Sequence, residues 1–420
     1  MTANRCRVGV VATRLAGTDG VSLEAAKWAA CLEALGHECF YFAGECDRPP
    51  ARTHIAQEAH FKHPTMLTLT EQLFSGERRT EALSDQVQAL KDHLKAELRA
   101  FRRRFDLQAL IVENALSLPV NIPLGLALTE FIAETYLPCI AHHHDFTWER
   151  KRFAISAAGD YLRTAFPPSL PPIRHVVINS FAARQLALRT GASSVLIPNV
   201  MDFDQAPPAG GFDPAPLRAA LELQPDEHLL LQPTRVVPRK RIEMAIELTR
   251  RLDLPCVLVI THASGDEGSS YEAYLRDHAR LSGVRVVFAS DLFDVEPGRT
   301  RNGRPVYPLA EAYRACGLVT YPSAVEGFGN AFLEAIYYRR PLVMSTYEIF
   351  RTDIQPKGFR VIGFDDYIGE DTIEQARGVL ADPARAAEIS EHNFAIGRRH
   401  YSLRALEHAL RGLMEGCDPD

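Results

Sequence analysis

The chain has 420 residues, of which 46% are hydrophobic and 24% charged, and its formal net charge is −6. This composition excludes a disordered or fibrous protein, and the acidic balance argues against a protein that mainly binds nucleic acid, because such proteins need a basic surface. The sequence contains no run of about 20 apolar residues, the length that a helix needs to span a bilayer, so we expect no transmembrane segment.

The cysteines and the N-terminal residues bear on the cellular compartment in which the protein is expected. The eight cysteines are scattered, without a Cys-x-x-Cys pair, which favours thiols of a reducing environment over disulfides. The N-terminus enters a valine-rich run with no small-residue cleavage site, so no signal peptide is expected. We therefore expect a cytoplasmic enzyme, and at about 150 residues per domain the length predicts two or three domains.

The first half of the sequence alternates apolar runs with helical patterns. A glycine-containing turn over 17–20 follows the first predicted strand, Ser22 could cap the next helix, and residues 69–105 have the pattern of one long polar helix. Strands are predicted at residues 7–12, 39–43, 107–112, 139–143 and 175–178. Such a βαβα succession is typical of a parallel sheet with helices on both faces.

The same rhythm restarts after Ile197-Pro198-Asn199 and a proline- and glycine-rich stretch. Strands are predicted at residues 229–232, 256–261, 284–289, 318–321 and 342–345, and helices at 242–252, 271–281, 331–338 and 403–414. We therefore predict an α/β protein of two doubly wound, Rossmann-like domains, residues 1–200 and 201–400. Ligands bind beyond the carboxyl ends of such strands, so the expected site is the cleft between the domains.

One segment, residues 321–335, combines a strand end, a loop with two glycines and a helix that Asn330 could cap. The glycines let backbone amides approach a ligand, and a helix N-terminus favours an anion or a polarised oxygen. Glu326 and Glu334 are eight residues apart, so they could bond hydroxyls on two parts of one extended ligand, such as a sugar and a ribose. The alternative is a capping loop with an exposed glutamate.

A second segment opens directly from a predicted strand and carries Arg235 and Lys240. Both cations lie at the carboxyl end of that strand, where a guanidinium fork and a point charge could converge on a diphosphate. The alternative is a solvated basic turn capped by Glu243. The glutamate loop in the same half of the chain favours the diphosphate interpretation.

Together, these two segments and the Pro-Leu-Val strand that follows resemble the retaining enzymes of glycosyltransferase family 4, which have the GT-B fold. The matching motif is Glu-Gly-Phe-Gly-x-x-x-Leu-Glu-Ala, beginning at Glu326. The loop over 17–20, Gly36-His37, His144-Asp145 and the linker over 197–202 also resemble family motifs, so the resemblance covers most of the chain. The stretches at 142–145 and 329–338 are similar to the compatible-solute branch, which includes trehalose synthases and mannosyl- or glucosylglycerate-type enzymes.

The resemblance implies roles on the donor side. Arg235 and Lys240 would hold the donor diphosphate. Glu326 would meet the transferred sugar, and Glu334 the ribose hydroxyls. Further donor contacts are implied for Gly20, Gly327, Phe328, Gly329 and Asn330.

The resemblance also implies roles for the first domain. His144 would meet hydroxyls of the sugar and completes the implied catalytic set with Arg235, Lys240 and Glu326. Candidates for the acceptor side are Asp19, Asp145 and Glu149. A C-terminal helix over 401–416 would pack back on the first domain, as the last helix of the family does.

Three positions depart from the family pattern. Thr234 stands where a glycine commonly precedes the arginine, and Arg339-Arg340 replaces a small residue or glycine before Pro341. The first loop reads Gly-Thr-Asp-Gly in place of Gly-Gly. No departure removes a charged donor contact, but the last lies beside the expected acceptor end.

Three consecutive histidines, His142 to His144, suggest a zinc site at first sight. Successive side chains of a strand point to opposite faces, so the three cannot easily share one metal, and no His-Glu-x-x-His motif is present. At least one of them, His143, is expected inside the domain core. We predict no metal site.

The sequence thus predicts a glycosyltransferase that moves glucose or mannose from a UDP- or GDP-hexose to a small hydroxylated acceptor, such as a sugar or glycerate derivative. No carboxylate nucleophile stands out, so the family pattern implies metal-independent front-side transfer with retention. No bound cofactor and no nucleic acid partner are expected, and a homodimer remains open. The alternatives are a lipid or polysaccharide acceptor, a GT-B epimerase or phosphorylase, and a non-catalytic sugar-nucleotide sensor.

Overall fold

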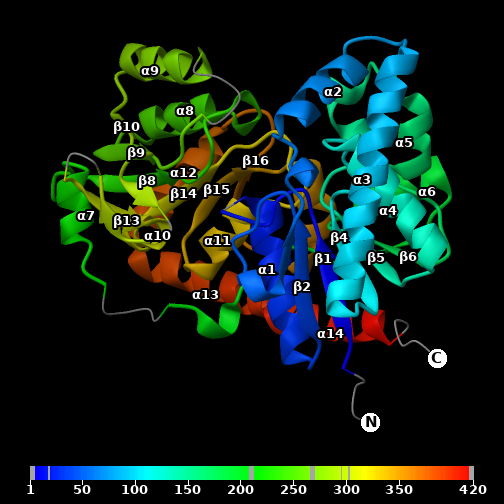
Figure 1. The fold of residues 1–420 in the computed structure, drawn as a ribbon. Coiled ribbons are helices and arrows are strands. Elements are labelled where there is room, and N and C mark those ends of the chain that lie inside the picture. The colour runs from blue at the N-terminus through cyan, green and yellow to red at the C-terminus, as the bar shows by residue number, and fades with distance from the viewer. Residues whose placement is uncertain are drawn as a thin grey trace. The chain divides into compact units, whose positions relative to one another are not determined.

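The computed structural model describes residues 5–17, 19–207, 212–264, 270–294, 296–300 and 303–415. The chain divides into two compact units, one of Met1–Val200 with Leu403–Asp420 and the other of Met201–Ser402. Each unit has a parallel sheet covered by helices (Figure 1). No disulfide joins the cysteines of the described ranges, and Cys417 lies outside them.

The first unit is built on a seven-stranded sheet in the order β3-β2-β1-β4-β5-β6-β7. All neighbouring strands are parallel. The strands are β1 (Arg7–Val11), β2 (Glu38–Ala43), β3 (Thr53–Ile55), β4 (Ala109–Glu113), β5 (Cys139–His143), β6 (Ile173–Val177) and β7 (Ser194–Leu196). The strand order reverses between β1 and β4, which is the point where open α/β sheets bind their ligands.

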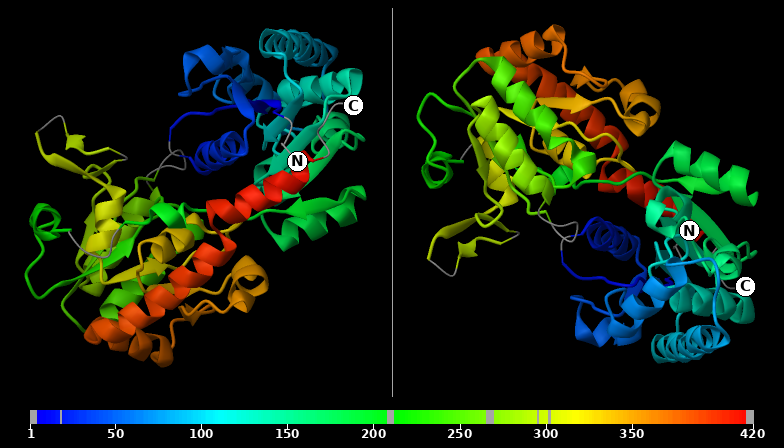
Figure 2. Two further views of the ribbon diagram at one scale, coloured as in Figure 1. Left: turned by 90° about the horizontal axis from the view of Figure 1, so that it is seen from below. Right: turned by 90° about the horizontal axis from the view of Figure 1, so that it is seen from above.

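Helices cover both faces of this sheet. They are α1 (Gly20–Ala34), α2 (Pro64–Phe74), α3 (Glu81–Phe105), α4 (Ile122–Thr135), α5 (Gly159–Ala165), α6 (Ser180–Thr190) and α14 (Leu403–Met414). One core cluster joins α1 and α14 to the sheet around Trp28 and Leu410, and another joins α3 and α4 around Phe101 and Phe131. Figure 2 shows α14, at the red end of the chain, beside the N-terminal elements in blue.

Two local predictions are wrong in this unit. Residues 69–105 form parts of two helices, α2 and α3, because Gly76 interrupts the pattern and the Thr80 side chain caps α3 by accepting a bond from Leu83 N. Helix α1 begins at Gly20 and is capped by Asp19, whose carboxylate accepts from the backbone amides of Val21 and Ser22. The predicted cap, Ser22, lies inside the helix.

The second unit contains a six-stranded parallel sheet in the order β10-β9-β8-β14-β15-β16. Its strands are β8 (His228–Gln232), β9 (Cys256–Ile260), β10 (Val286–Phe288), β14 (Leu318–Tyr321), β15 (Leu342–Ser345) and β16 (Ile362–Phe364). A small sheet pairs β13 (Pro305–Pro308) with β11 (Phe293–Asp294) and β12 (Gly298–Arg299). The main sheet follows the pattern of the first unit, with its reversal between β8 and β14.

Helices also cover this second sheet. They are α7 (Ala215–Ala220), α8 (Ile242–Leu252), α9 (Ser270–Ser282), α10 (Leu309–Ala315), α11 (Asn330–Tyr337), α12 (Glu370–Ala381) and α13 (Pro383–His400). α8, α9 and α12 share one core cluster with the strands, and α11 packs with α13 (Figure 1). Within the described ranges, no helix combines the length and apolarity that a bilayer crossing needs.

Candidate functional site

The two segments predicted to bind the donor meet in the second unit. A backbone hydrogen bond of 2.9 Å from Ala324 N to Arg239 O joins the segment after β8 to the loop after β14. Lys240 Nζ donates to Glu326 Oε1, and Arg239 Nη1 lies 3.5 Å from Glu326 Oε2. Because β8 and β14 flank the reversal of strand order, this cluster lies where the fold places ligands.

Lys240 and Glu326 form a buried ion pair, with each side chain only 10% exposed. Burial alone would raise the pKa of Glu326, but the charges of Lys240 and Arg239 outweigh it and lower that pKa. Burial lowers the pKa of Lys240, while Glu326 acts in the opposite direction. A buried carboxylate of this kind is stable only with a partner, so the pair is a local structural unit.

Arg235 lies near this pair but is exposed. It acts electrostatically on Lys240 and on His262, whose pKa is lowered first by burial and then by Lys240 and Arg235. Sequence reasoning missed His262; the available signal was its place directly after the predicted strand over 256–261. An exposed guanidinium beside an ammonium can bind the oxygens of a phosphate.

Tyr347 holds the glycine loop over residues 327–329, because its hydroxyl donates to Phe328 O at 2.7 Å. Gly329 has φ +112°, and a Cβ on it would lie 2.3 Å from Tyr347 Oη, so only glycine fits there. Gly329 is therefore the cap of α11, and Asn330 is the first helical residue. The prediction of Asn330 as the cap is wrong by one position. Gly327 lies in the same loop.

Glu334 lies in α11, half-buried, and accepts a 2.6 Å hydrogen bond from the Tyr313 hydroxyl. Burial, followed by the charge of Glu334, raises the pKa of Tyr313 well above its usual range, so this hydroxyl remains a donor. The bond fixes one carboxylate oxygen of Glu334. Its predicted role toward ribose hydroxyls stays a prediction.

The structure describes two of the positions that depart from the family pattern. Thr234 Oγ1 accepts a 2.7 Å bond from the fully buried Gln232, whose Oε1 in turn accepts from Thr320. Thr234 thus satisfies a polar group of the sheet interior. Arg339 has φ +53°, a left-handed position that favours glycine, and it is held by Glu391 at 2.7 Å.

In the first unit, the loop after β1 carries Asp19 and Gly20. The capping carboxylate of Asp19 also accepts a 2.9 Å bond from Arg14 and a 2.6 Å bond from the Ser22 hydroxyl. Burial would raise the pKa of Asp19, but the bonds from Ser22 and the charge of Arg14 lower it. Gly20 begins α1, and Thr18 of the predicted turn lies outside the described residues.

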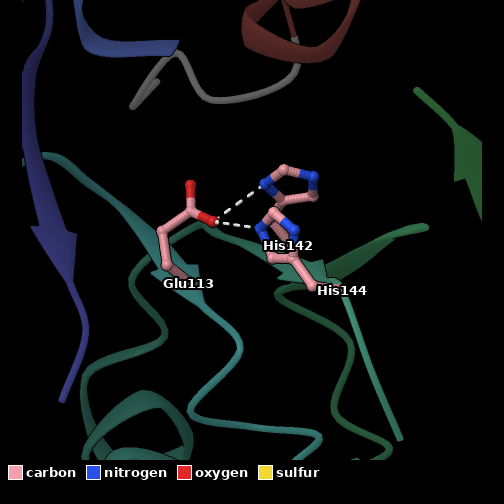
Figure 3. Close-up of side chains that lie close together, drawn as sticks. All are labelled: Glu113, His142 and His144. Carbon is pink, nitrogen blue, oxygen red and sulfur yellow. Dashed lines mark hydrogen bonds and ion pairs between the residues drawn. The ribbon is translucent and has the colours of Figure 1, made fainter. Parts of the chain in front are cut away.

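The three histidines, two at the end of β5 and one directly after it, point to two sides of the strand. His143 is fully buried and bonds His175 at 2.9 Å, so it lies in the core as expected. His142 and His144 point the other way, toward one carboxylate oxygen of Glu113 (Figure 3). His142 Nδ1 lies 2.9 Å, and His144 Nε2 3.1 Å, from Glu113 Oε2.

Glu113 is the residue of this cluster that sequence reasoning missed. It is the last residue of β4, and its side chain is fully buried. Burial would raise its pKa, but the charges and hydrogen bonds of His142 and His144 lower it to about 2. The same contacts outweigh burial at His144 and raise the pKa of that imidazole. The only sequence signal was a glutamate directly after an apolar run.

One oxygen and two nitrogens of Glu113, His142 and His144 lie within 4.8 Å of one another and could ligate a divalent cation. The three histidines do not lie on one side of the strand, but the pair two residues apart does meet at Glu113, so the prediction of no metal site stays a prediction. However, His142 Nε2 has no hydrogen-bond partner among the described residues, whereas metal-bound imidazoles usually donate their second nitrogen to another group. The three donor atoms could ligate a metal, but the second nitrogen of His142 lacks the partner that a metal-bound imidazole usually has.

The other two acceptor-side candidates follow β5 closely. Asp145 accepts a 2.6 Å bond from Arg150. Glu149 accepts a 2.7 Å bond from Phe146 N; loss of solvent around its carboxyl group raises its pKa to about 7, and the charge of Asp145 adds to the effect. The structure thus places His144, Asp145 and Glu149 along one short segment.

The sequence is similar over almost its full length to two known proteins. Mannosylglucosylglycerate synthase of Thermotoga maritima is 31% identical over 426 aligned residues, which cover 93% of this chain and 96% of that protein. The protein of the same name from Petrotoga mobilis is 30% identical over 441 residues, covering 94% and 98%. No protein-family model matches the chain.

Solved structures confirm the predicted GT-B fold. Sucrose-phosphate synthase from Thermosynechococcus elongatus superimposes with a TM-score of 0.69 at 15% identity, over 98% of this chain and 99% of that one. A glycosyltransferase from Rickettsia africae gives 0.70 at 11% identity, over 99% and 100%. Anabaena HepE in complex with UDP-glucose gives 0.64 at 13% identity, over 98% and 100%.

Proposed function

We infer that this chain, which belongs to the mannosylglucosylglycerate synthase family of GT-B glycosyltransferases, transfers a glucosyl or mannosyl group from a nucleoside-diphosphate sugar to a small glycerate-containing acceptor. The enzyme class follows from near-full-length similarity to two synthases of that name. The choice of donor and acceptor is our proposal.

The observation that carries this proposal is the buried Lys240–Glu326 pair beside exposed Arg235 at the reversal of the second sheet. A nucleoside-diphosphate sugar presents two anionic phosphates next to a row of hydroxyls. Lys240 and Arg235 supply cationic donors for the phosphates, and Glu326 supplies an acceptor for hydroxyls. Charge and hydrogen-bonding capacity thus match the diphosphate and the sugar of the donor.

The same groups suit the chemistry of transfer. Breaking the glycosyl–phosphate bond leaves extra negative charge on the diphosphate, which Arg235 and Lys240 can neutralise at fixed positions. We propose that the acceptor hydroxyl attacks on the side from which the diphosphate leaves, and that the phosphate oxygen takes the hydroxyl proton. This route needs no enzymatic nucleophile and retains the configuration of the anomeric carbon.

The first unit supplies groups that suit carbohydrate hydroxyls. His144 offers an imidazole nitrogen, and Asp19, Asp145 and Glu149 offer carboxylate oxygens. We propose that His144 contacts a hydroxyl of the transferred sugar and that the carboxylates orient the acceptor. The glycerate part of the acceptor is suggested by the names of the two relatives.

The test is a matrix of reactions. UDP-glucose, GDP-glucose, UDP-mannose and GDP-mannose are each incubated with glycerate and with glucosylglycerate, and products are measured by mass spectrometry. We expect one donor to give a product one hexose heavier than one of these acceptors. A changed sugar without any acceptor would identify an epimerase, and donor binding without nucleotide release would identify a sensor.

A further inference from the structure

Two consecutive residues at the end of β4, Glu113 and Asn114, hold the segment that carries His144. Glu113 Oε2 bonds the His144 imidazole at Nε2, at 3.1 Å. Asn114 Oδ1 accepts the backbone amides of His144 and Asp145, each at 3.1 Å. One residue thus fixes the ring of His144, and the next fixes its backbone.

Asn114 adopts a conformation that few residues tolerate. Its φ is +59°, in the left-handed region where non-glycine residues are uncommon and asparagine is enriched. The Ser117 hydroxyl donates to Asn114 Oδ1 at 3.0 Å, and Asn114 N donates to His142 O at 2.8 Å. Such strained residues persist where the surroundings fix them, and they cluster at functional sites.

Exposure separates the members of the cluster. The side chains of Glu113 and His142 are 0% and 1% exposed, and that of His144 is 8% exposed. Trp28 stacks on His142 with ring centres 4.2 Å apart, which holds the orientation of that ring. His144 is thus the most exposed of the three side chains, and because Nε2 bonds Glu113, Nδ1 is the ring nitrogen left to bond a ligand.

The location agrees with this division of roles. β4 lies on one side of the strand-order reversal in the first sheet, and β5 is its next neighbour. The loops at the carboxyl ends of these strands occupy the region where open α/β sheets bind ligands. A carboxylate that is fully buried there, with two histidines as its partners, must be balanced by them.

We propose that Glu113 and Asn114 are positioning residues of the transfer reaction, holding His144 so that Nδ1 faces a hydroxyl of the transferred sugar. This inference rests on the proposed role of His144. By bonding Nε2, Glu113 determines that Nδ1 of His144 is the nitrogen available to the sugar. By bonding the backbone amides of His144 and Asp145, Asn114 determines the position of the imidazole. Neither residue is assigned a contact with the substrate.

The test compares variants of the full-length enzyme in steady-state kinetics, together with nucleotide binding by calorimetry. Glu113→Gln keeps the shape but loses the carboxylate, and we expect a kcat about 10- to 100-fold lower with donor KM and nucleotide Kd within about twofold of wild type. Glu130→Gln, which changes a half-buried carboxylate bound by Lys91 and Lys95 outside the proposed site, is the control and should leave kcat unchanged.

A second pair separates positioning from folding. Asn114→Gly relieves the backbone conformation but removes the Oδ1 acceptor, so we expect a melting temperature near wild type and a kcat at least about 10-fold lower. Asn114→Asp keeps the acceptor oxygen and should restore kcat to within about threefold. Wild-type kcat in both Glu113→Gln and Asn114→Gly would overturn the proposal.

Two further measurements separate a failure of the positioning inference from a failure of the proposed function. If His144→Ala has wild-type kcat, the role of His144 in the proposed function fails; if only that variant is inactive, the positioning inference alone fails. Purified enzyme is also assayed for metal content and titrated with Zn²⁺. We expect no stoichiometric zinc, and zinc that is bound by wild type and lost in Glu113→Gln would overturn the proposal in favour of a metal site.

Discussion

The two units place a buried glutamate beside the strand-order reversal and neutralise it in different ways. Glu326 follows β14 and pairs with Lys240, whereas Glu113 ends β4 and bonds His142 and His144. A lysine offers a compact positive charge with donors only, and a histidine can donate at one nitrogen and accept at the other. The first arrangement suits phosphate, and the second suits sugar hydroxyls.

The two sites also differ in their backbone. The Glu326 loop contains glycine at φ +112°, packed against Tyr347, and the Glu113 turn contains asparagine at φ +59°. Glycine adopts a backbone conformation closed to other residues, whereas the asparagine side chain binds the neighbouring segment. In the second unit a glycine shapes the loop, whereas in the first an asparagine side chain holds the backbone of the segment that carries His144.

Removing the Glu326 carboxylate should give the largest effect. We expect Glu326→Ala to lower kcat/KM by about 1000-fold, because it removes a sugar contact and leaves Lys240 buried without its partner. Kinetics at a temperature where the variant is folded will check this. Arg102→Ala, at the end of α3, should remain near normal, and equal losses in the two variants would show that the site is misplaced.

Lowering the pH should remove the contribution of the Glu326 carboxylate to the free energy of unfolding. The folded pKa of Glu326 lies below its usual value near 4.5, so its stabilisation is present above about pH 4.5 and is lost as pH falls through the folded pKa. We expect wild type to exceed Glu326→Gln by about 3–5 kcal/mol in unfolding free energy at pH 7. The difference should begin to shrink once the pH falls below about 4.5 and should keep shrinking until it passes the folded pKa. A constant difference in denaturant unfolding would contradict the buried ion pair.

Arg235 should separate binding from stability. Because the side chain is exposed, we expect Arg235→Ala to reduce kcat/KM by about 10- to 100-fold through lost phosphate contacts. The melting temperature should stay within about 2 °C, as for most surface substitutions. A large drop in melting temperature with unchanged kinetics would assign Arg235 a structural role instead.

Chelation should have the smallest effect. The proposed transfer relies on Arg235 and Lys240 to neutralise the diphosphate, so activity in excess EDTA should stay within about twofold of the untreated enzyme. The measurement is initial rate before and after dialysis against EDTA. Activity that disappears and returns with a divalent cation would contradict metal-independent transfer.

Much of the fold follows from the sequence, because strands buried on both faces appear as short apolar runs. The strands Cys139–His143, Leu318–Tyr321 and Leu342–Ser345 and the helix Ile242–Leu252 have the predicted bounds. Helix caps were harder to predict, since Asp19 and Gly329 cap the helices for which Ser22 and Asn330 were the predicted caps. Several side chains compete for each cap, and local packing decides among them.

The candidate site could be predicted only where its residues share one motif. Arg235, Lys240, Glu326 and Glu334 belong to recognisable segments, but Glu113 lies 31 positions before His144. Their contact depends on β4 and β5 being neighbours in the sheet, which no local pattern reveals. The predicted strand also ended at Val112, which left the glutamate outside it.

Calorimetric titration with nucleotides tests the central claim most directly. If Lys240 and Arg235 bind a diphosphate, UDP or GDP should bind wild type at least about 100-fold more tightly than the matching nucleoside. That preference should fall at least about 10-fold in Arg235→Ala. Equal affinity for nucleoside and diphosphate, or an unchanged preference in the variant, would contradict the account.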